Sequence, residues 1–171
     1  MNGFLQVYTG NGKGKTTAAI GLAVRAAGAG LNVLFAQFVK GAHYSEITAL
    51  ERFGDRITVR QYGRECFIVS QADAADIEAA RQGLAQVGGY LQDPAFNVVI
   101  LDEASIALHY GLFSVNDLLG AIGRRHPACE VVVTGRYAPP QLCDAADLVT
   151  EMKEVRHYFT AGVEARTGIE R

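Results

Sequence analysis

A glycine-rich segment near the start of the 171-residue chain carries its clearest chemical signal. The segment follows a short apolar run, precedes an alanine-rich stretch, and reads Thr9, Gly10, Asn11, Gly12, Lys13, Gly14, Lys15, Thr16, Thr17. Glycines adopt positive φ at little cost and let backbone N–H groups approach phosphate oxygens. A helix that begins there adds unpaired donors and partial positive charge. Residues 10–17 therefore predict a phosphate-binding loop that takes a nucleoside triphosphate.

Two side chains of this loop have roles that follow from their chemistry. Lys15 is expected to reach phosphate oxygens as a catalytic point charge, and the Thr16 hydroxyl suits a hard, octahedral Mg²⁺ ion. The standard pattern G-x-x-x-x-G-K-[ST] has a glycine where this chain has Thr9. With Thr9 at this position the loop can still bind a nucleotide. The sequence does not decide whether the phosphates lie along the loop in the order found in ordinary NTPases. A glycine-rich turn without a ligand is the weaker alternative.

A second chemical signal is the acidic end of an apolar run at residues 98–101, which is followed by Asp102 and Glu103. Ligands of open α/β sheets bind at the carboxyl ends of the strands. Thr16, Asp102 and Glu103 are therefore the candidate metal residues, with one carboxylate orienting Mg²⁺ or its water shell. Glu103 is also a candidate catalytic residue, either at the metal or as a general base on water. The sequence leaves these two roles open.

Other candidates follow neighbouring apolar runs. Arg136 comes after residues 131–134 and could donate to the triphosphate, be a surface arginine, or pair with Asp144. Lys40 faces either phosphate or solvent. Tyr62 and Phe67 lie in or beside a segment without clear periodicity and could wall a large flat ligand. The four histidines have no metal-ligand spacing.

Short apolar runs alternate with longer amphipathic stretches, which predicts repeated strand-helix units. We expect strands over residues 4–8, 33–39, 57–61, 98–102, 131–134 and 148–152. We expect helices over residues 15–29, 45–53, 73–91, 114–124 and 140–146. Gly28 and Gly30 are expected to end the first helix, Ser114 to cap the fourth, and Asp93-Pro94 to close the third. The expected fold is a single α/β domain over residues 1–171, with three layers and a mostly parallel sheet covered by helices on both faces.

Composition excludes several classes of protein. A net charge of −2 predicts neither nucleic-acid binding nor attachment to an anionic membrane. The three cysteines form no CxxC pair, so neither a disulfide framework nor a zinc ribbon is expected. The first residues lack the pattern of a signal peptide, and no apolar run approaches the roughly 20 residues of a membrane span. We therefore expect a cytoplasmic protein.

Taken together, several segments resemble the P-loop corrinoid adenosyltransferases over almost the whole chain. These segments are TGNGKGKTTAAIGLAVRAAG, QFVKG, VVILDEASIAL, VVVTGRYAPPQLCDAADLVTEM and FTAGVEARTGIE. The resemblance implies a RecA-like P-loop NTPase fold and a homodimer, with ATP and a corrinoid as substrates and Mg²⁺ as cofactor. It also implies a partner that supplies electrons, either a reductant or a flavoprotein.

The chemistry implied by the resemblance is transfer of the 5′-deoxyadenosyl group of ATP to cobalt, with release of inorganic triphosphate, in adenosylcobalamin synthesis or salvage. ATP is expected to lie reversed relative to ordinary NTPases, and Thr9 in place of glycine is consistent with this. Aromatic residues such as Tyr62 and Phe67 are expected to displace the lower axial ligand of the corrinoid, which eases reduction to Co(I).

Two alternatives stand beside this interpretation. An ordinary P-loop ATPase or kinase would use Glu103 to polarise water or a hydroxyl and would release ADP. A nucleotide-sensing module would bind ATP tightly and form no product. The identity of the phosphate product separates all three.

Overall fold

A six-stranded, entirely parallel sheet forms the centre of the protein in the computed structural model, which describes residues 2–41, 44–63 and 72–170. The strand order is β3-β2-β4-β5-β1-β6. In chain order the strands are β1 Leu5–Thr9, β2 Val33–Gln37, β3 Ile57–Gln61, β4 Val98–Asp102, β5 Glu130–Thr134 and β6 Leu148–Glu151. The expected three-layer α/β fold is confirmed, and the sheet is fully rather than mostly parallel.

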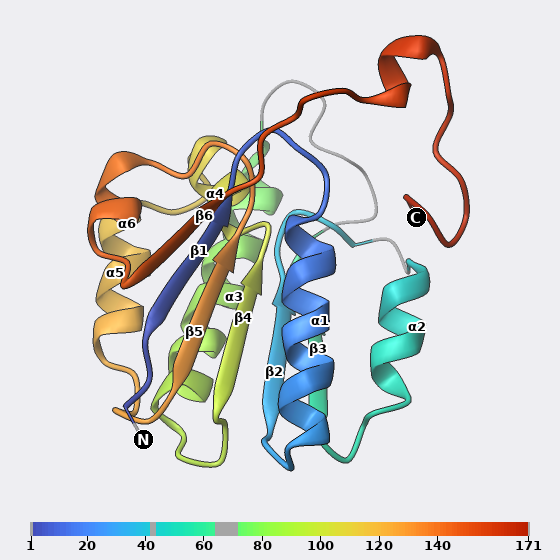
Figure 1. Ribbon diagram of the computed structural model, residues 1–171. Helices are drawn as coiled ribbons and strands as arrows, with labels where there is room; N and C mark the ends of the chain where they lie inside the picture. Colours follow the sequence, from blue (N-terminus) through green and yellow to red (C-terminus); the bar gives the residue numbers. More distant parts are fainter. Residues whose placement is uncertain (1, 42–43, 64–71, 171) are drawn as a thin grey trace.

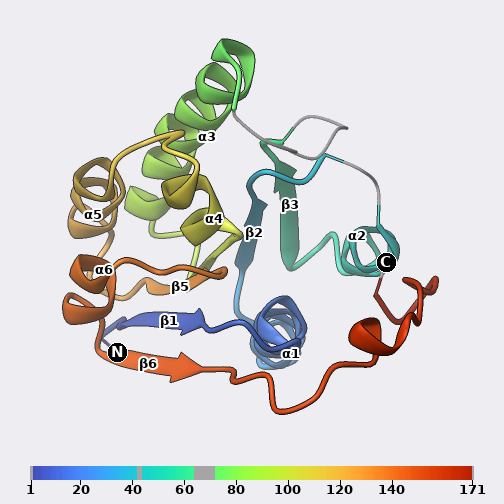
Figure 2. The same ribbon diagram turned by 90° about the horizontal axis from the view of Figure 1, so that it is seen from above.

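Helices cover both faces of this sheet (Figure 1). They are α1 Lys15–Gly28, α2 Ser45–Glu51, α3 Ala74–Gln92, α4 Ala104–His109, α5 Val115–Gly123 and α6 Pro140–Asp144, with a 3₁₀ turn η1 at Tyr158–Ala161. Seen from above, α1 and α2 lie on one side of the sheet, and α3, α4 and α5 lie on the other (Figure 2). None of the helices in the described part of the chain is long and apolar enough to cross a bilayer.

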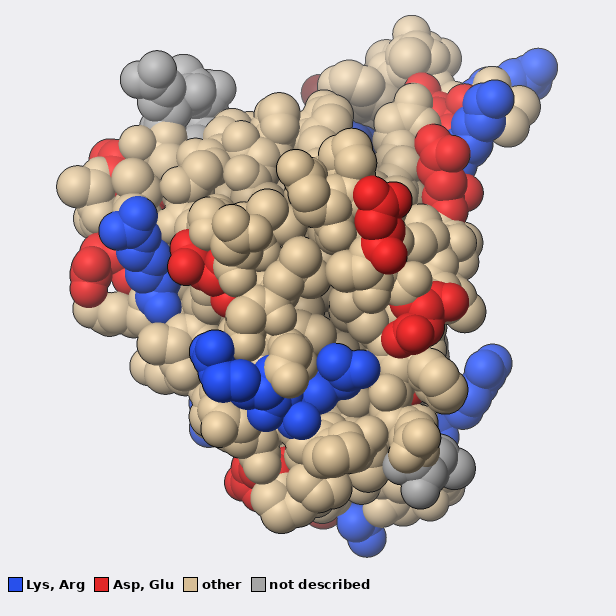
Figure 3. Space-filling view, turned by 90° about the vertical axis from the view of Figure 1, so that its left-hand side faces the viewer, with Lys and Arg blue, Asp and Glu red and all other residues tan. Residues whose placement is uncertain are grey.

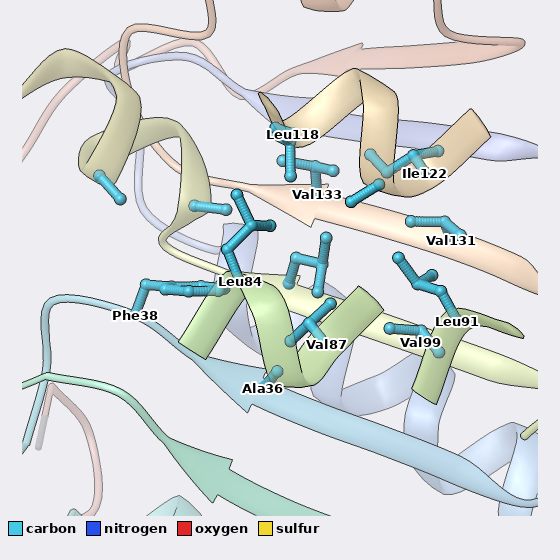
Figure 4. Packing of buried hydrophobic residues seen from close by; sticks show 14 of the residues in the cluster. Ala36, Phe38, Leu84, Val87, Leu91, Val99, Leu118, Ile122, Val131 and Val133 are labelled. Atoms are coloured by element: carbon cyan, nitrogen blue, oxygen red, sulfur yellow. The ribbon is translucent and has the colours of Figure 1, made fainter. Parts of the chain in front are cut away.

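Alternating side chains of the central strands build two apolar clusters, one on each face of the sheet. Phe35 and Ile100 pack with the alanines of α1 and with α2, whereas Leu34 and Val99 pack in the cluster under α3 and α5. Figure 4 shows Leu84, Val87 and Leu91 of α3 meeting Leu118 and Ile122 of α5 above the strands. Every residue of β2 and β4 is buried, as expected for strands covered on both faces.

Most predicted boundaries hold within two residues, and the capping predictions are confirmed. Ser114 caps α5 in a capping box with Asp117, Gly30 adopts φ +81° after α1, and Asp93 is the C-cap of α3. The predicted extension of β2 to Val39 is wrong: the chain turns at Val39, whose φ is +67°, and Lys40 N donates to the Phe38 carbonyl at 2.7 Å. The helix α4 and the turn η1 were not predicted.

Gly83 of α3 lies directly against the side chain of Tyr62, the residue that follows β3. A Cβ added at Gly83 would lie 2.5 Å from Cγ of Tyr62, whereas one added at Gly89 would meet nothing within 4 Å. We expect Gly83→Ala to lower the free energy of unfolding by about 1–3 kcal/mol, because the Tyr62 ring must shift in a packed core.

The matched control is Gly89→Ala in the same helix, which should raise the free energy of unfolding by about 0.5–1 kcal/mol through helix propensity. Urea unfolding of the two variants measures both values. Equal effects would show that Tyr62 does not pack against Gly83 in solution.

Candidate active site

The phosphate loop connects β1 to α1 at the carboxyl edge of the sheet. Gly10 and Gly14 have φ of +96° and +121°, which only glycine adopts without strain. A Cβ at Gly12 would lie 2.7 Å from the carbonyl oxygen of Met152, and Gly12 N donates to the same oxygen at 2.7 Å. The segment after β6 therefore fixes the loop from outside, a contact that local sequence patterns do not reveal.

The start of α1 is open to an anion. No side chain caps this helix, and its first backbone bond runs from Ala18 N to the Gly14 carbonyl at 2.8 Å. The preceding N–H groups of the first turn have no acceptor within the helix. They add to the partial positive charge of the helix N-terminus, which favours phosphate oxygens.

Lys15 lies folded over the loop that it follows. Its Nζ donates to the carbonyl oxygens of Gly10 and Gly12, each at 2.7 Å, and the residue is only 8% exposed. Burial, and next the nearby Arg136 guanidinium, lower the pKa of the Lys15 ammonium. A phosphate anion placed against Lys15 would stabilise its charged form and so oppose both of these effects on its pKa. The site is therefore electrostatically suited to a polyphosphate.

Asp102 lies beneath the loop and is completely buried. Its Oδ1 accepts hydrogen bonds from Thr16 Oγ1 at 2.9 Å and Thr134 Oγ1 at 2.6 Å, and its Oδ2 accepts one from Gln37 Nε2 at 2.9 Å. Asp102 thus ties α1 to three neighbouring strands. Its oxygens are engaged, and it orients the Thr16 hydroxyl.

Glu103 occupies an unusual backbone position directly after β4. Its φ of +58° is left-handed, and its N–H donates to Thr134 Oγ1 at 3.1 Å. This turn ends the strand and starts α4. The Glu103 carboxylate forms an ion pair with Lys40, Oε1 to Nζ, at 3.1 Å, and both side chains are about one-fifth exposed, at 20% and 22%.

Lys40 is a cation whose side chain is held at this edge of the sheet by its ion pair with Glu103. Burial opposes its charge, but the carboxylates of Asp102 and Glu103 outweigh burial and raise the pKa of Lys40. The sequence left Lys40 between phosphate and solvent. The structure pairs it with Glu103 at the rim of the site.

A cavity of about 740 Å³ joins these groups and is of the size that small-molecule sites have. The candidates that line it are Gly12, Lys13, Gly14, Lys15, Thr16, Thr17, Lys40, Glu103 and Arg136. The sequence did not single out several further lining residues, namely Ile20, Ser45, Glu46, Ile106, Tyr110, His157, Gly168, Ile169 and Glu170. The remaining loop candidates, Gly10 and Asn11, do not line the cavity: Asn11 Oδ1 accepts from Glu154 N at 3.1 Å, and the Gly10 carbonyl accepts from Lys15 Nζ.

Arg136 extends from the turn after β5 into this cavity and is exposed. Among the ion pairs of residues 2–41, 44–63 and 72–170, none joins Arg136 to Asp144. The described residues therefore do not display the pairing with Asp144, whereas the exposure of Arg136 fits a surface arginine as well as a phosphate ligand.

Tyr62, one of the two aromatic candidates, is not among the residues that line the cavity. Tyr62 packs its ring 5.4 Å from that of Phe38, and its buried hydroxyl has no hydrogen-bond partner among the residues described. Burial first, with Tyr90 adding to it, raises the pKa of Tyr62 to about 12. Phe67 lies outside the described residues.

The donor set fits Mg²⁺ better than a transition metal. Within the described ranges no group of three or more His, Cys, Asp or Glu side chains could hold an ion. The Thr16 hydroxyl and the carboxylates of Asp102 and Glu103 are hard oxygen donors, and such sites complete magnesium coordination with phosphate and water.

Comparisons with known proteins agree with this geometry. The sequence profile of the family described as ATP:corrinoid adenosyltransferase BtuR/CobO/CobP matches residues 1–171. The chain is 39% identical to the corrinoid adenosyltransferase of Pseudomonas aeruginosa over 169 residues, which cover 98% of this chain and 83% of that protein. It is 37% identical to the corrinoid adenosyltransferase CobA of Salmonella typhimurium, with 98% and 85% covered, and 33% identical to the corrinoid adenosyltransferase of Escherichia coli, with 98% and 85% covered. The protein therefore belongs to the ATP:corrinoid adenosyltransferase family, a family of transferases with the P-loop fold described above.

Proposed function

We propose that this enzyme transfers the 5′-deoxyadenosyl group of ATP to the cobalt of a reduced corrinoid and releases inorganic triphosphate, in adenosylcobalamin synthesis or salvage. The observation that carries the proposal is the convergence of Lys15, Thr16, Glu103 and Arg136 on one cavity in a chain of this family. The loop N–H groups, Lys15 and Arg136 would hold the triphosphate.

The bond changes explain why such a cradle suffices. The electron pair of Co(I) forms a bond to C5′ of ATP, the bond from C5′ to oxygen breaks, and its electrons leave on the triphosphate. Negative charge therefore grows on the phosphate next to the ribose, where preorganised donors stabilise it. Co(I) is itself a strong nucleophile, so the reaction requires no general base.

The Lys40 ion pair supports transfer over hydrolysis. A hydrolysing ATPase needs a carboxylate that is available to accept a proton from water. The Glu103 carboxylate is instead held by Lys40 at 3.1 Å. We assign Glu103 to holding this edge of the site and its metal shell rather than to activating water, and ordinary ATPase or kinase activity is the less favoured alternative.

Magnesium would bind beside Thr16, with Asp102 acting through the Thr16 hydroxyl at 2.9 Å and Glu103 close by. The ion would supply positive charge to the phosphate oxygens. We further propose a homodimer, a cytoplasmic location, and a reductant or flavoprotein that delivers the electron to the corrinoid.

The corrinoid itself would meet an aromatic wall that includes Tyr62 and Phe67. An axial nitrogen donor raises the energy of the cobalt orbital that accepts the electron, so an apolar wall that displaces it eases the step from Co(II) to Co(I). We expect Phe67→Ala to slow adenosylation that starts from Co(II) far more than adenosylation of corrinoid reduced beforehand to Co(I). Parallel assays from the two oxidation states measure this, and equal slowing would reject the role of Phe67.

The proposed function itself is tested by incubating the protein with MgATP and a chemically reduced corrinoid and identifying the phosphate product. Triphosphate together with a light-sensitive corrinoid is the expected result. ADP would indicate an ATPase or kinase, and binding without any product would indicate a nucleotide-sensing module.

A further inference from the structure

The turn that carries Arg136 has an unusual backbone on both sides of the arginine. Gly135 has a φ of +138°, and Tyr137 has a φ of +61°. A tyrosine in the left-handed region is uncommon and strained, whereas a glycine adopts that region freely. Such a conformation persists only where the surrounding structure holds it, and it occurs preferentially at functional sites. We call Gly135, Arg136 and Tyr137 the arginine turn.

Both ends of the arginine turn pack on one face of α4. A Cβ added at Gly135 would lie 2.9 Å from Cβ of Ser105, so the backbone of the turn lies directly on this helix. Two residues later, the ring of Tyr137 lies against the ring of His109, with a centroid distance of 4.4 Å and an interplanar angle of 32°. Ser105 and His109 are four residues apart and therefore share one face of α4. The helix thus holds the turn at two points.

The two ends of the turn are not held equally by the backbone. Gly135 N donates to the Tyr8 carbonyl at 3.2 Å, which fixes the first end to β1. Beyond the second end, Ala138 N donates to Thr9 Oγ1 at 3.4 Å, which is long for a hydrogen bond. The ring contact of Tyr137 with His109 is therefore the closer restraint on the second end.

Arg136 lies between these restraints and lines the cavity. Its side chain is exposed, and it makes no hydrogen bond or ion pair to the described residues. Its guanidinium is nevertheless close enough to Lys15 to lower the pKa of that lysine. Within the described part of the chain, the direction of Arg136 therefore depends on the backbone of the turn.

We propose that Tyr137 and His109 are positioning residues, whose packed rings hold the left-handed turn and so point Arg136 at the triphosphate. The inference rests on the proposed function, which makes Arg136 a ligand of the triphosphate. A guanidinium that is already in position binds phosphate oxygens without first losing its conformational freedom. Neither ring needs to touch ATP, since neither residue lines the cavity.

The test measures by calorimetry how strongly inorganic triphosphate binds with Mg²⁺, together with kcat/KM for ATP. Arg136→Ala should raise the dissociation constant about 10–100-fold, the range expected for hydrogen bonds to charged groups. Tyr137→Ala and His109→Ala should each raise it about 3–10-fold, because the ligand must then order the arginine side chain. In the Arg136→Ala background neither change should have a further effect, since both act through Arg136.

Further variants separate positioning from stability. Tyr137→Phe keeps the ring and should bind triphosphate like the unmodified protein. Phe4→Ala should do the same, because it removes an exposed ring outside the cavity lining. Tyr137→Gly suits the left-handed φ but has no ring. It should be at least as stable in urea as Tyr137→Ala and yet bind triphosphate at least as weakly.

The outcomes distinguish this inference from the proposed function. If the ring variants bind triphosphate like the unmodified protein, or weaken binding equally with and without Arg136, the rings do not position the arginine. The inference is also wrong if Arg136→Ala leaves binding unchanged. If the unmodified enzyme releases ADP, the proposed function is wrong, whereas a loss of binding that depends on Arg136 would still support the positioning role.

Discussion

Replacing Lys15 by alanine is expected to lower kcat/KM for ATP about 10²–10³-fold, the loss typical of removing one preorganised donor from developing charge. Lys15 is folded over the phosphate loop, and only 8% of the residue is exposed. Its ammonium already donates to two backbone carbonyl groups of the loop. Its ammonium is thus placed before ATP arrives. The measurement is the rate of adenosylation of a corrinoid that has been reduced to Co(I), so that electron delivery does not limit the rate.

Lys153→Ala serves as the control for this variant, because Lys153 is an exposed lysine beside the loop. It should keep the activity of the unmodified enzyme. The free energy of unfolding of Lys15→Ala should change by only about 1 kcal/mol, since two hydrogen bonds are lost but a buried charge is removed. A Lys15→Ala enzyme that works at the unmodified rate would refute the role of the loop.

Replacing Asp102 by alanine is expected to have the largest effect on stability. The change leaves the fully buried Gln37 and Thr134, and the partly buried Thr16 hydroxyl, without their acceptor. Each buried donor left unsatisfied costs about 1–3 kcal/mol, so we expect the free energy of unfolding to fall by about 3–5 kcal/mol in total. Urea unfolding measures this fall, and activity should be lost because the Thr16 hydroxyl is no longer oriented.

Asp144→Ala is the comparison for that change, since Asp144 is an exposed carboxylate at the end of α6. It should alter the free energy of unfolding by less than about 0.5 kcal/mol. An Asp102→Ala protein as stable as Asp144→Ala would mean that the buried hydrogen bonds around Asp102 do not hold the sheet edge together.

The sequence predicted the parts of the fold that depend on local patterns. The bounds of β3 and β4 are as predicted, because apolar runs with clear ends determine them. The turn at Val39 and the left-handed Glu103 were not predictable in this way. Glu103 is held by a hydrogen bond to Thr134, which lies 31 residues later, and helix α4 begins only because that turn forms.

The site was predictable to the same extent. Loop residues 10–17 and the carboxylates after β4 have local signatures, and most of them line one cavity. Lys40 was assigned no partner, because its ion pair with Glu103 joins two strand ends that only the sheet order brings together. The hydrogen bonds from Lys13 to Ile169 and Glu170 had no local signal at all. Basic and acidic side chains are interspersed on the face that carries α5 and α6 (Figure 3), which agrees with the small net charge but marks no site.

The proposed reaction makes carbon, and not phosphorus, the electrophile in this active site. The most direct measurement uses ATP that carries ¹⁸O in the bridge between C5′ and the α-phosphorus. This labelled ATP is incubated with Mg²⁺, reduced corrinoid and the unmodified enzyme. Breaking the bond from C5′ to oxygen predicts that all of the label appears in the released triphosphate and none in a nucleoside product. Label retained on a nucleoside or on ADP would contradict the account.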